Sequence, residues 1–260
     1  MLFCPLFSGS SGNATYIEAG NVRLLVDAGA AGIRVENALK LGGFDPRALN
    51  AILVTHEHTD HVAGVGILSR KYGIPVYANA ACFLAMEKST GTIAPHCTRV
   101  FETNRDFFIG EVNVLPFSTP HDAVEPVGYT FTHNRCKAGV LTDIGCMEDR
   151  LYDAVDGCEL LLLESNHDID MLNYGPYPYP LKQRILSRKG HLSNDDCGAA
   201  LTRLYARGLR HAILGHLSKD NNRPELALKT VGNALTAEGV YDMSVMMSYR
   251  DRPCGVFHLE

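Results

Sequence analysis

Three histidines and one aspartate lie within residues 56–61, directly after the short hydrophobic run 51–54: His56, His58, Asp60 and His61. Alternate side chains at the end of a strand point the same way, so His56 and His58 can share one metal ion. Asp60 and His61 follow where the chain turns into a helix, and they can reach a second ion. Imidazole ligands suit zinc, and the oxygen ligands also admit manganese. The cluster therefore predicts a site for two divalent metal ions, zinc or manganese.

Three later residues can complete this site, because each follows a predicted hydrophobic strand as the histidine cluster does. His121 is the candidate third ligand for the ion of His56 and His58. His216 is the corresponding candidate for the second ion. Asp143 ends its strand in a carboxylate that can bridge two cations. The repeated pattern, an apolar strand that ends in one ligand, supports each of the three assignments.

A further pair of residues offers candidates for proton transfer. Glu164 ends the apolar run that begins at residue 160, and His191 stands just before a predicted helix with Ser193 as its N-cap and Asp196 as the capping partner. Because a helix start attracts anions, His191 would lie over a bound phosphate and could donate a proton to the leaving oxygen. Glu164 or a neighbouring carboxylate would orient it. With Asp60, these two residues are the predicted catalytic groups.

Candidate substrate-binding residues come from four polar segments. The small-residue loop 7–13 can cradle a phosphate with its backbone N–H groups. Tyrosines followed by four cations over residues 174–189 can stack bases and hold phosphates of a single strand. The segments after Glu164 and His216 add further polar groups. The candidates are Ser10, Ser11, Asn13, Asn166, His167, Tyr177, Lys182, Arg184, Ser218, Asn221, Asn222 and Arg223.

The elements that must position these residues alternate along the whole chain. Strands are predicted at residues 14–19, 22–26, 51–54, 75–78, 107–109, 111–117, 127–132, 137–142, 160–164, 211–214, 245–248 and 255–258. Helices are predicted at 33–40, 62–71, 194–207 and 224–238, and residues 173–180 are interpreted as a functional loop. Strands in both halves with helices between them predict an α/β fold, an αββα sandwich of two mixed sheets formed by residues 1–260 as one domain.

Composition narrows the class of protein. Hydrophobic residues make up 46% of the 260 and charged residues 20%, which excludes intrinsic disorder. No apolar run is long enough to span a bilayer and residues 1–7 do not resemble a signal peptide, so we expect a cytoplasmic protein without a membrane partner. The eight cysteines form no CxxC pair and are expected to be reduced and mostly buried. A net charge of -5 excludes a broadly basic surface but not a focused, salt-sensitive groove for nucleic acid.

The order of these motifs resembles the metallo-β-lactamase fold superfamily of di-metal hydrolases over essentially the whole chain. The resemblance implies that Asp27 supports the ligand loop through hydrogen bonds. True β-lactamases usually lack an aspartate at the position of Asp143 and carry a cysteine on the second metal, so antibiotic hydrolysis is not expected. The segments around Ser10, Glu164, His191 and His216 resemble the bacterial YycJ/WalJ-type hydrolases, which are associated with 5′-to-3′ DNA exonuclease activity.

We therefore expect a di-metal phosphodiesterase, a 5′-to-3′ exonuclease on single-stranded or nicked DNA with a metal-bridging hydroxide as nucleophile. Two alternatives remain at this stage. One is a small-molecule cyclic phosphodiesterase or thioester hydrolase that uses the same metals. The other is a metal-binding module without turnover, in which His191 and Glu164 would have no task. The sequence leaves the native metal, the choice between DNA and RNA, and the oligomeric state open.

Overall fold

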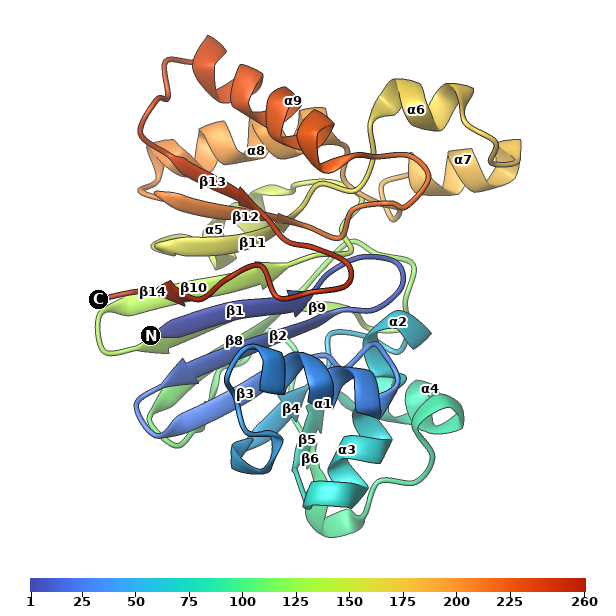
Figure 1. The fold of residues 1–260 in the computed structure, drawn as a ribbon, viewed down its shortest axis with the longest axis vertical. Helices are drawn as coiled ribbons and strands as arrows, with labels where there is room; N and C mark the ends of the chain where they lie inside the picture. Colours follow the sequence, from blue (N-terminus) through green and yellow to red (C-terminus); the bar gives the residue numbers. More distant parts are fainter.

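Two sheets of seven strands pack face to face, and helices cover their outer faces (Figure 1). This computed structural model describes all residues from 1 to 260. The arrangement confirms the predicted αββα sandwich. None of the helices combines the length and the apolar character needed to cross a membrane. All eight cysteines are free thiols and six of them are buried, as predicted.

The first sheet has the strand order β14-β1-β2-β3-β4-β5-β6. Its strands are β1 (Leu2–Phe7), β2 (Ala14–Ala19), β3 (Val22–Val26), β4 (Ala51–Leu53), β5 (Val76–Ala78), β6 (Thr98–Val100) and β14 (Phe257–His258). Pairing is antiparallel from β14 to β3 and parallel from β3 to β6. The helices of this half are α1 (Gly32–Leu41), α2 (Thr59–Val62), α3 (Val65–Tyr72) and α4 (Ala80–Thr90), with short 3₁₀ turns at Pro46–Ala48 and Pro95–Cys97.

The second sheet has the order β13-β12-β11-β10-β9-β8-β7. Its strands are β7 (Phe107–Ile109), β8 (Val112–Ser118), β9 (Val127–His133), β10 (Cys136–Leu141), β11 (Leu160–Glu164), β12 (His211–Gly215) and β13 (Ser244–Met247). Pairing is antiparallel from β7 to β10 and parallel from β10 to β13. The helices are α5 (Asp149–Ala154), α6 (Ile169–Tyr174), α7 (Tyr179–Ile185), α8 (Asn194–Ala206) and α9 (Pro224–Ala237). Figure 1 shows α6 and α7 extending beyond the end of this sheet.

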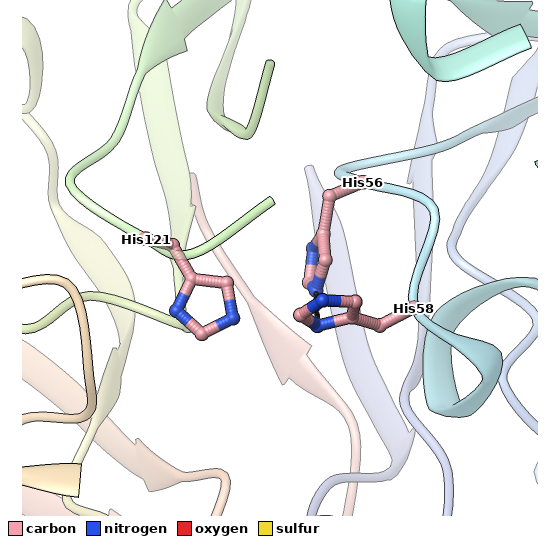
Figure 2. Close-up of side chains that lie close together, drawn as sticks. All are labelled: His56, His58 and His121. Atoms are coloured by element: carbon pink, nitrogen blue, oxygen red, sulfur yellow. Dashed lines mark hydrogen bonds between the residues drawn. The ribbon is translucent and has the colours of Figure 1, made fainter. Parts of the chain in front are cut away.

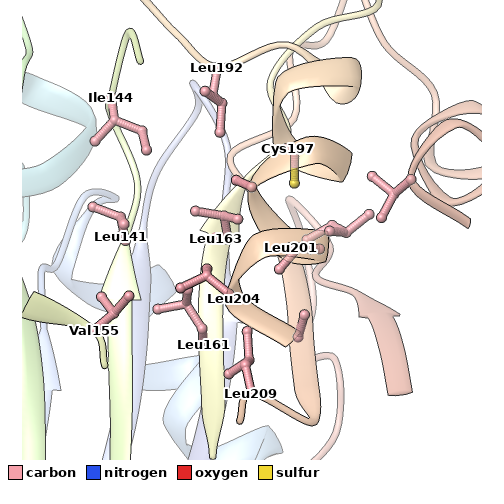
Figure 3. Packing of buried hydrophobic residues seen from close by; sticks show 14 of the residues in the cluster. Leu141, Ile144, Val155, Leu161, Leu163, Leu192, Cys197, Leu201, Leu204 and Leu209 are labelled. Atoms are coloured by element: carbon pink, nitrogen blue, oxygen red, sulfur yellow. The ribbon is translucent and has the colours of Figure 1, made fainter. Parts of the chain in front are cut away.

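Strand β11 shows how the sequence divides its side chains between two cores. Its leucines are all buried. Because successive side chains of a strand point to opposite faces, Leu160 and Leu162 pack between the two sheets. Leu161 and Leu163 pack on the other face, against the buried side chains of α8 (Figure 3). A buried leucine contributes about 1.5–3 kcal/mol relative to an exposed one, so this apolar run fixes β11 in the centre of the second sheet.

Most predicted strands and the long helices α1, α8 and α9 are present, but several features differ. Strand β6 and helices α5, α6 and α7 were not predicted, and the ends of α6 and α7 overlap residues 173–180, which were interpreted as a loop. The predicted helix over 62–71 is two helices, because the chain breaks at Gly64, whose N–H donates to the carbonyl of Ala28. A Cβ at Gly64 would lie 2.5 Å from the carbonyl oxygen of Ala30, so the backbone is pressed against the preceding loop. Residues 2–7, considered above only as a chain terminus, form the buried strand β1. The hydrophobic stretch of α4 was not predicted as a helix.

Candidate metal centre

The predicted ligands gather at one edge of the sandwich, in helix α2 and in the loops that follow β4, β8, β10 and β12. The carboxyl ends of the parallel strands β10 and β12 meet at this edge. Asp27, Asp143 and His216 all have positive φ values, of 59°, 58° and 54°. Left-handed backbone at a residue other than glycine costs on the order of 1 kcal/mol and clusters at functional sites. Each of these residues follows a strand, so the sharp turn ends the extended backbone and brings the side chain to this edge.

His56, His58 and His121 form the first group. Their ligand atoms all lie within 4.8 Å of one another, and Figure 2 shows His121 facing the other two rings from a separate loop. Nε2 of His56 lies 3.1 Å from Nδ1 of His58. Two nitrogens bound tetrahedrally to one zinc ion at 2.0–2.1 Å are about 3.3 Å apart. The spacing of these two histidines therefore fits ligands of a single ion.

Hydrogen bonds select which ring nitrogen each of these histidines presents. Thr55 Oγ1 donates to Asp27, so at 3.0 Å it accepts from Nδ1 of His56. Nδ1 of His121 donates to the carbonyl of Gly190 at 3.1 Å, and its Nε2 has no hydrogen-bond partner. Such bonds fix the tautomer of a ligating histidine and orient the ring. His56 and His121 thus turn a free lone pair toward the site.

Asp60, His61 and His216 form the second group, again with their ligand atoms within 4.8 Å of one another. Oδ2 of Asp60 lies 3.7 Å from Nε2 of His61 and 3.7 Å from Nε2 of His216. Nδ1 of His61 donates to Oδ2 of Asp27 at 2.8 Å. Asp27 also accepts from the N–H and the hydroxyl of Thr55, the residue before His56.

Asp143 lies between the two groups. Its Oδ2 is 3.2 Å from Nε2 of His61, and its Oδ1 is 3.8 Å from Nε2 of His121. One carboxylate therefore faces a histidine of each group, which is the arrangement that a bridging ligand requires.

The donor set fits a pair of divalent metal ions. Three of the buried atoms have no hydrogen-bond partner: Nε2 of His121, Oδ2 of Asp143 and Nε2 of His216. A buried polar atom left without a partner costs about 1–3 kcal/mol, and all three belong to the proposed ligands. Bound cations would satisfy them and would neutralise the buried carboxylates.

The two groups differ in their affinity for protons. Burial lowers the pKa values of His56 and His121, so these rings are neutral near pH 7. Burial also opposes charge on His61, but the carboxylates of Asp143, Asp27 and Asp60 outweigh it and raise its pKa well above 6.5. The pKa of His216 is raised to about 10 despite burial, by Asp143, Asp60 and Glu164. Without metal, protons therefore occupy the second group.

Glu164 links His191 to this centre. Its Oε1 accepts from Nδ1 of His191 at 2.8 Å, and its Oε2 accepts from the backbone N–H of Ile144 at 2.8 Å. Burial opposes ionisation of Glu164, but the charges and hydrogen bonds of His191 and His216 lower its pKa to about 2. Burial also opposes charge on His191, yet the Glu164 carboxylate raises its pKa above 6.5. His191, with 22% of its side chain exposed, is a proton-bearing group that solvent can reach.

Six of the predicted substrate-binding residues are buried: Asn13, Asn166, His167, Ser218, Asn221 and Asn222. Several of these side chains form hydrogen bonds within the protein instead. Asn222 donates to the carbonyls of Ser165 and Asn166, and Asn166 donates to the carbonyl of His216. These amides hold the loops beneath the ligands, and their burial leaves no face for substrate. His167 has both ring nitrogens without partners, and burial lowers its pKa to about 4.

The other predicted substrate-binding residues lie nearer the surface. Ser10, Ser11, Arg184 and Arg223 are exposed, and Tyr177 and Lys182 are half-buried. Lys182 donates to the carbonyls of Asn173 and Gly175, and the Tyr177 hydroxyl donates to Asp220. Both side chains therefore stabilise the loop between α6 and α7. The tyrosines available for stacking are Tyr174 and Tyr179, which are 88% and 73% exposed.

Asn13 and Ser8 contact the centre in ways that the sequence did not indicate. The Asn13 amide lies 3.0 Å from Nε2 of His61 and donates to the carbonyl of Asp60. The Ser8 hydroxyl accepts from the N–H of His216, a residue 208 positions away. The small-residue loop, predicted to cradle a phosphate, contacts the second ligand group in the structure. No local signal in the sequence could have revealed these long-range bonds.

Comparisons with known proteins agree with this geometry. Residues 22–217 match the model of the Beta-lactamase superfamily domain. The exodeoxyribonuclease YycJ of Bacillus anthracis is 40% identical over 237 residues, which cover 91% of this chain and 90% of that protein. The exodeoxyribonuclease WalJ of Streptococcus pneumoniae is 43% identical over 232 residues, 88% of this chain and 86% of that protein. The solved structure of the metallo-beta-lactamase fold protein YhfI from Bacillus subtilis, 19% identical, superposes with a TM-score of 0.73 over 99% of each chain.

Proposed function

Because this chain belongs to the beta-lactamase superfamily and is a metal-dependent hydrolase, we propose that it is a two-metal exodeoxyribonuclease that removes nucleotides from the 5′ end of single-stranded or nicked DNA. Two relatives that are 40% and 43% identical over most of their length bear the name exodeoxyribonuclease, and this supports a DNA substrate.

The pairing of His191 with Glu164 is the observation that carries the proposal. Nδ1 of His191 lies 3.9 Å from Asp143, so the ring stands at the edge of the metal ligands. Its raised pKa favours the protonated ring near neutral pH. A phosphodiester placed against the ligands would then have an acid beside its leaving 3′ oxygen, which is worth about 10²–10⁴ in rate. A site that only stores metal needs no such pair.

The metal ions would be held by the groups described above. His56, His58 and His121 would hold one ion, and Asp60, His61 and His216 the other, with Asp143 between them. When bound, the ions would lower the pKa of water and offset the negative charge that develops on the phosphate. The first group, with nitrogen ligands alone, favours zinc, whereas the carboxylates of the second also suit manganese.

The arm formed by α6 and α7 supports a single-stranded substrate. Figure 1 shows this arm projecting past the second sheet. Tyr174 and Tyr179 are its most exposed aromatic side chains, and each base stacked on an aromatic ring contributes about 1–3 kcal/mol. Arg184 on α7 forms a 2.5 Å ion pair with Asp122, the neighbour of His121. The arm is therefore fixed to the ligand loop, where it can guide a strand toward the metals.

An assay on two substrates tests this proposal. Single-stranded oligonucleotides labelled at the 5′ or the 3′ end would be incubated with metal-loaded protein, in parallel with bis-p-nitrophenyl phosphate. We expect labelled mononucleotide to appear at once from the oligonucleotide labelled at its 5′ end. From the oligonucleotide labelled at its 3′ end it should appear only late in the reaction. Hydrolysis of the small ester with an intact oligonucleotide would instead support the cyclic phosphodiesterase or thioester hydrolase alternatives. No hydrolysis of either substrate by zinc- or manganese-loaded protein would support a metal-binding module.

A further inference from the structure

A cavity of about 410 Å³ lies beside the loop that follows His216 and is lined mainly by polar and basic residues. Its walls come from four separate segments: the loop after β1, helix α1, the loop between β12 and α9, and the chain after β13. The lining includes Arg34, Leu217, Lys219, Tyr249 and Arg250. None of its charged residues was predicted from the sequence to bind substrate.

The backbone joins one wall of the cavity to the second ligand group. Leu217, in the lining, directly follows His216 and forms an isolated β-bridge with Gly9. Ser8 accepts from the N–H of His216 and donates its own N–H to the carbonyl of Tyr249. One short loop therefore contacts a metal ligand on one side and the cavity wall on the other.

Three cations of the lining have no acidic partner. No carboxylate oxygen lies within 4.0 Å of the charged groups of Arg34, Lys219 or Arg250. By contrast, the surface arginines Arg150, Arg184, Arg188, Arg203 and Arg207 all form ion pairs with carboxylates. The single acidic residue of the lining, Asp251, is exposed. The cavity therefore carries a local excess of positive charge in a protein whose net charge is -5.

Backbone carbonyls hold the two guanidinium groups in place. Arg34 donates to the carbonyl of Arg250 at 2.7 Å, and Arg250 donates to the carbonyl of Ser218 at 3.2 Å. These neutral acceptors fix the side chains without cancelling their charge. A guanidinium group has five N–H donors, so each retains donors for a ligand. Rigid, unneutralised guanidinium groups are suited to bind phosphate oxygens.

We propose that this cavity binds one nucleotide unit of the substrate strand by its phosphate, next to the unit that is cleaved. This inference rests on the function proposed above. The volume lies in the range of small-molecule sites, about 300–1,000 Å³, and accommodates a nucleotide. Arg34 and Arg250 contact the phosphate oxygens and Lys219, at the exposed rim, adds a third charge. The phosphate is either an internal phosphodiester or the terminal 5′-phosphate.

Steady-state kinetics on a single-stranded oligonucleotide test the cavity. Arg250→Gln and Lys219→Gln, compared with wild type in the metal-loaded protein, are expected to raise KM about tenfold and to change kcat less than twofold. The dependence of log KM on log salt concentration should become shallower by about 0.7, the value for one phosphate contact on a single strand. Oligonucleotides with a 5′-phosphate and with a 5′-hydroxyl show which phosphate the cavity binds. If the variants raise KM only for the 5′-phosphorylated oligonucleotide, the cavity binds the terminal 5′-phosphate. If they raise KM equally for both oligonucleotides, it binds an internal phosphodiester.

Matched controls keep the result decisive. Arg135 and Lys88 are exposed and form no ion pair, and both lie outside the cavity, so Arg135→Gln and Lys88→Gln should leave KM unchanged. Arg250 packs against Gly9, so Lys219→Gln, on the surface, provides the test if Arg250→Gln does not fold. The inference would be overturned if KM were unchanged in Lys219→Gln and in folded Arg250→Gln, or if KM rose equally in the two controls. Either result would leave the exonuclease proposal intact. A wild-type protein that fails to cleave DNA would refute both.

Discussion

His191 and His216 share one acceptor: Nδ1 of His191 lies 2.8 Å, and Nδ1 of His216 2.9 Å, from the same Oε1 atom of Glu164. One buried carboxylate thus orients a candidate metal ligand and the candidate acid together. The proton-transfer group cannot move independently of the second ligand group, and substitution of Glu164 should affect both.

Replacing Glu164 by Gln removes the negative charge and keeps the shape of the side chain. The charge of Glu164 raises the pKa of His191, so its loss should lower that pKa. The reaction needs the protonated ring, and activity falls as the pH rises through its pKa; the alkaline limb of the kcat profile should therefore move to lower pH. We expect kcat near neutral pH to fall about 100-fold. Metal content is measured in parallel, and an unmoved alkaline limb would contradict the proton-donor role.

Replacing His58 by Ala removes one ligand of the first group, and the only side-chain contact of His58 at hydrogen-bond distance is with His56. We expect the protein to fold, to lose one metal ion, and to lose hydrolysis by more than about 10³-fold, because the remaining ligands cannot close the site. Circular dichroism checks the fold and elemental analysis counts the metal. His96 is exposed and lies outside both groups, so His96→Ala serves as the control. Full hydrolysis by His58→Ala would exclude the two-metal mechanism.

Metal binding should depend on pH differently at the two groups. The lowered pKa values of His56 and His121 mean that the first ion displaces no proton from them near pH 7. The raised pKa values of His61 and His216 mean that the second ion must displace about two protons. Affinity for the second ion should therefore rise more steeply between pH 6 and pH 8 than affinity for the first. Calorimetry in two buffers of different ionisation enthalpy counts the protons; equal counts for both ions would contradict this asymmetry.

Most of the predicted strands and candidate metal ligands follow from two features of the sequence: the pattern of apolar runs and the close spacing of residues 56–61. Apolar runs end where the ligands begin, so local sequence indicated both the strands and the side chains at their ends. The partners of those ligands could not be predicted in this way, because Ser8 and His216 are 208 residues apart and meet only when β1 and β12 end at the same edge. Likewise, the burial of Asn221 and Asn222 depends on how loops pack, which residue type alone does not indicate.

The core beneath the site should be sensitive to cavities. Leu161 is fully buried in the cluster between β11 and the outer helices, so Leu161→Ala should lower the free energy of unfolding by about 2–5 kcal/mol. Leu84 is 78% exposed on α4, and Leu84→Ala should change the free energy of unfolding by less than about 0.5 kcal/mol. Urea denaturation measures both. Similar losses in the two variants would mean that β11 is not the centre of the second core.

Asp27 offers the sharpest separation of the two metal positions. Its carboxylate is almost fully buried and accepts from Nδ1 of His61 and twice from Thr55, so all three partners are donors. In Asp27→Asn, one acceptor becomes an NH₂ group that must face a donor, either His61 or Thr55. The His61 ring would lose its fixed tautomer, and such changes typically cost 10–100-fold in metal affinity. We expect the second ion to be lost on dialysis while the first is retained, so metal content falls from two ions to one. Asp45→Asn is the matched control, because Asp45 is an exposed N-cap where Asn serves equally well. Retention of both ions by Asp27→Asn would show that His61 is held by other contacts, and loss of both would show that the two positions are not independent.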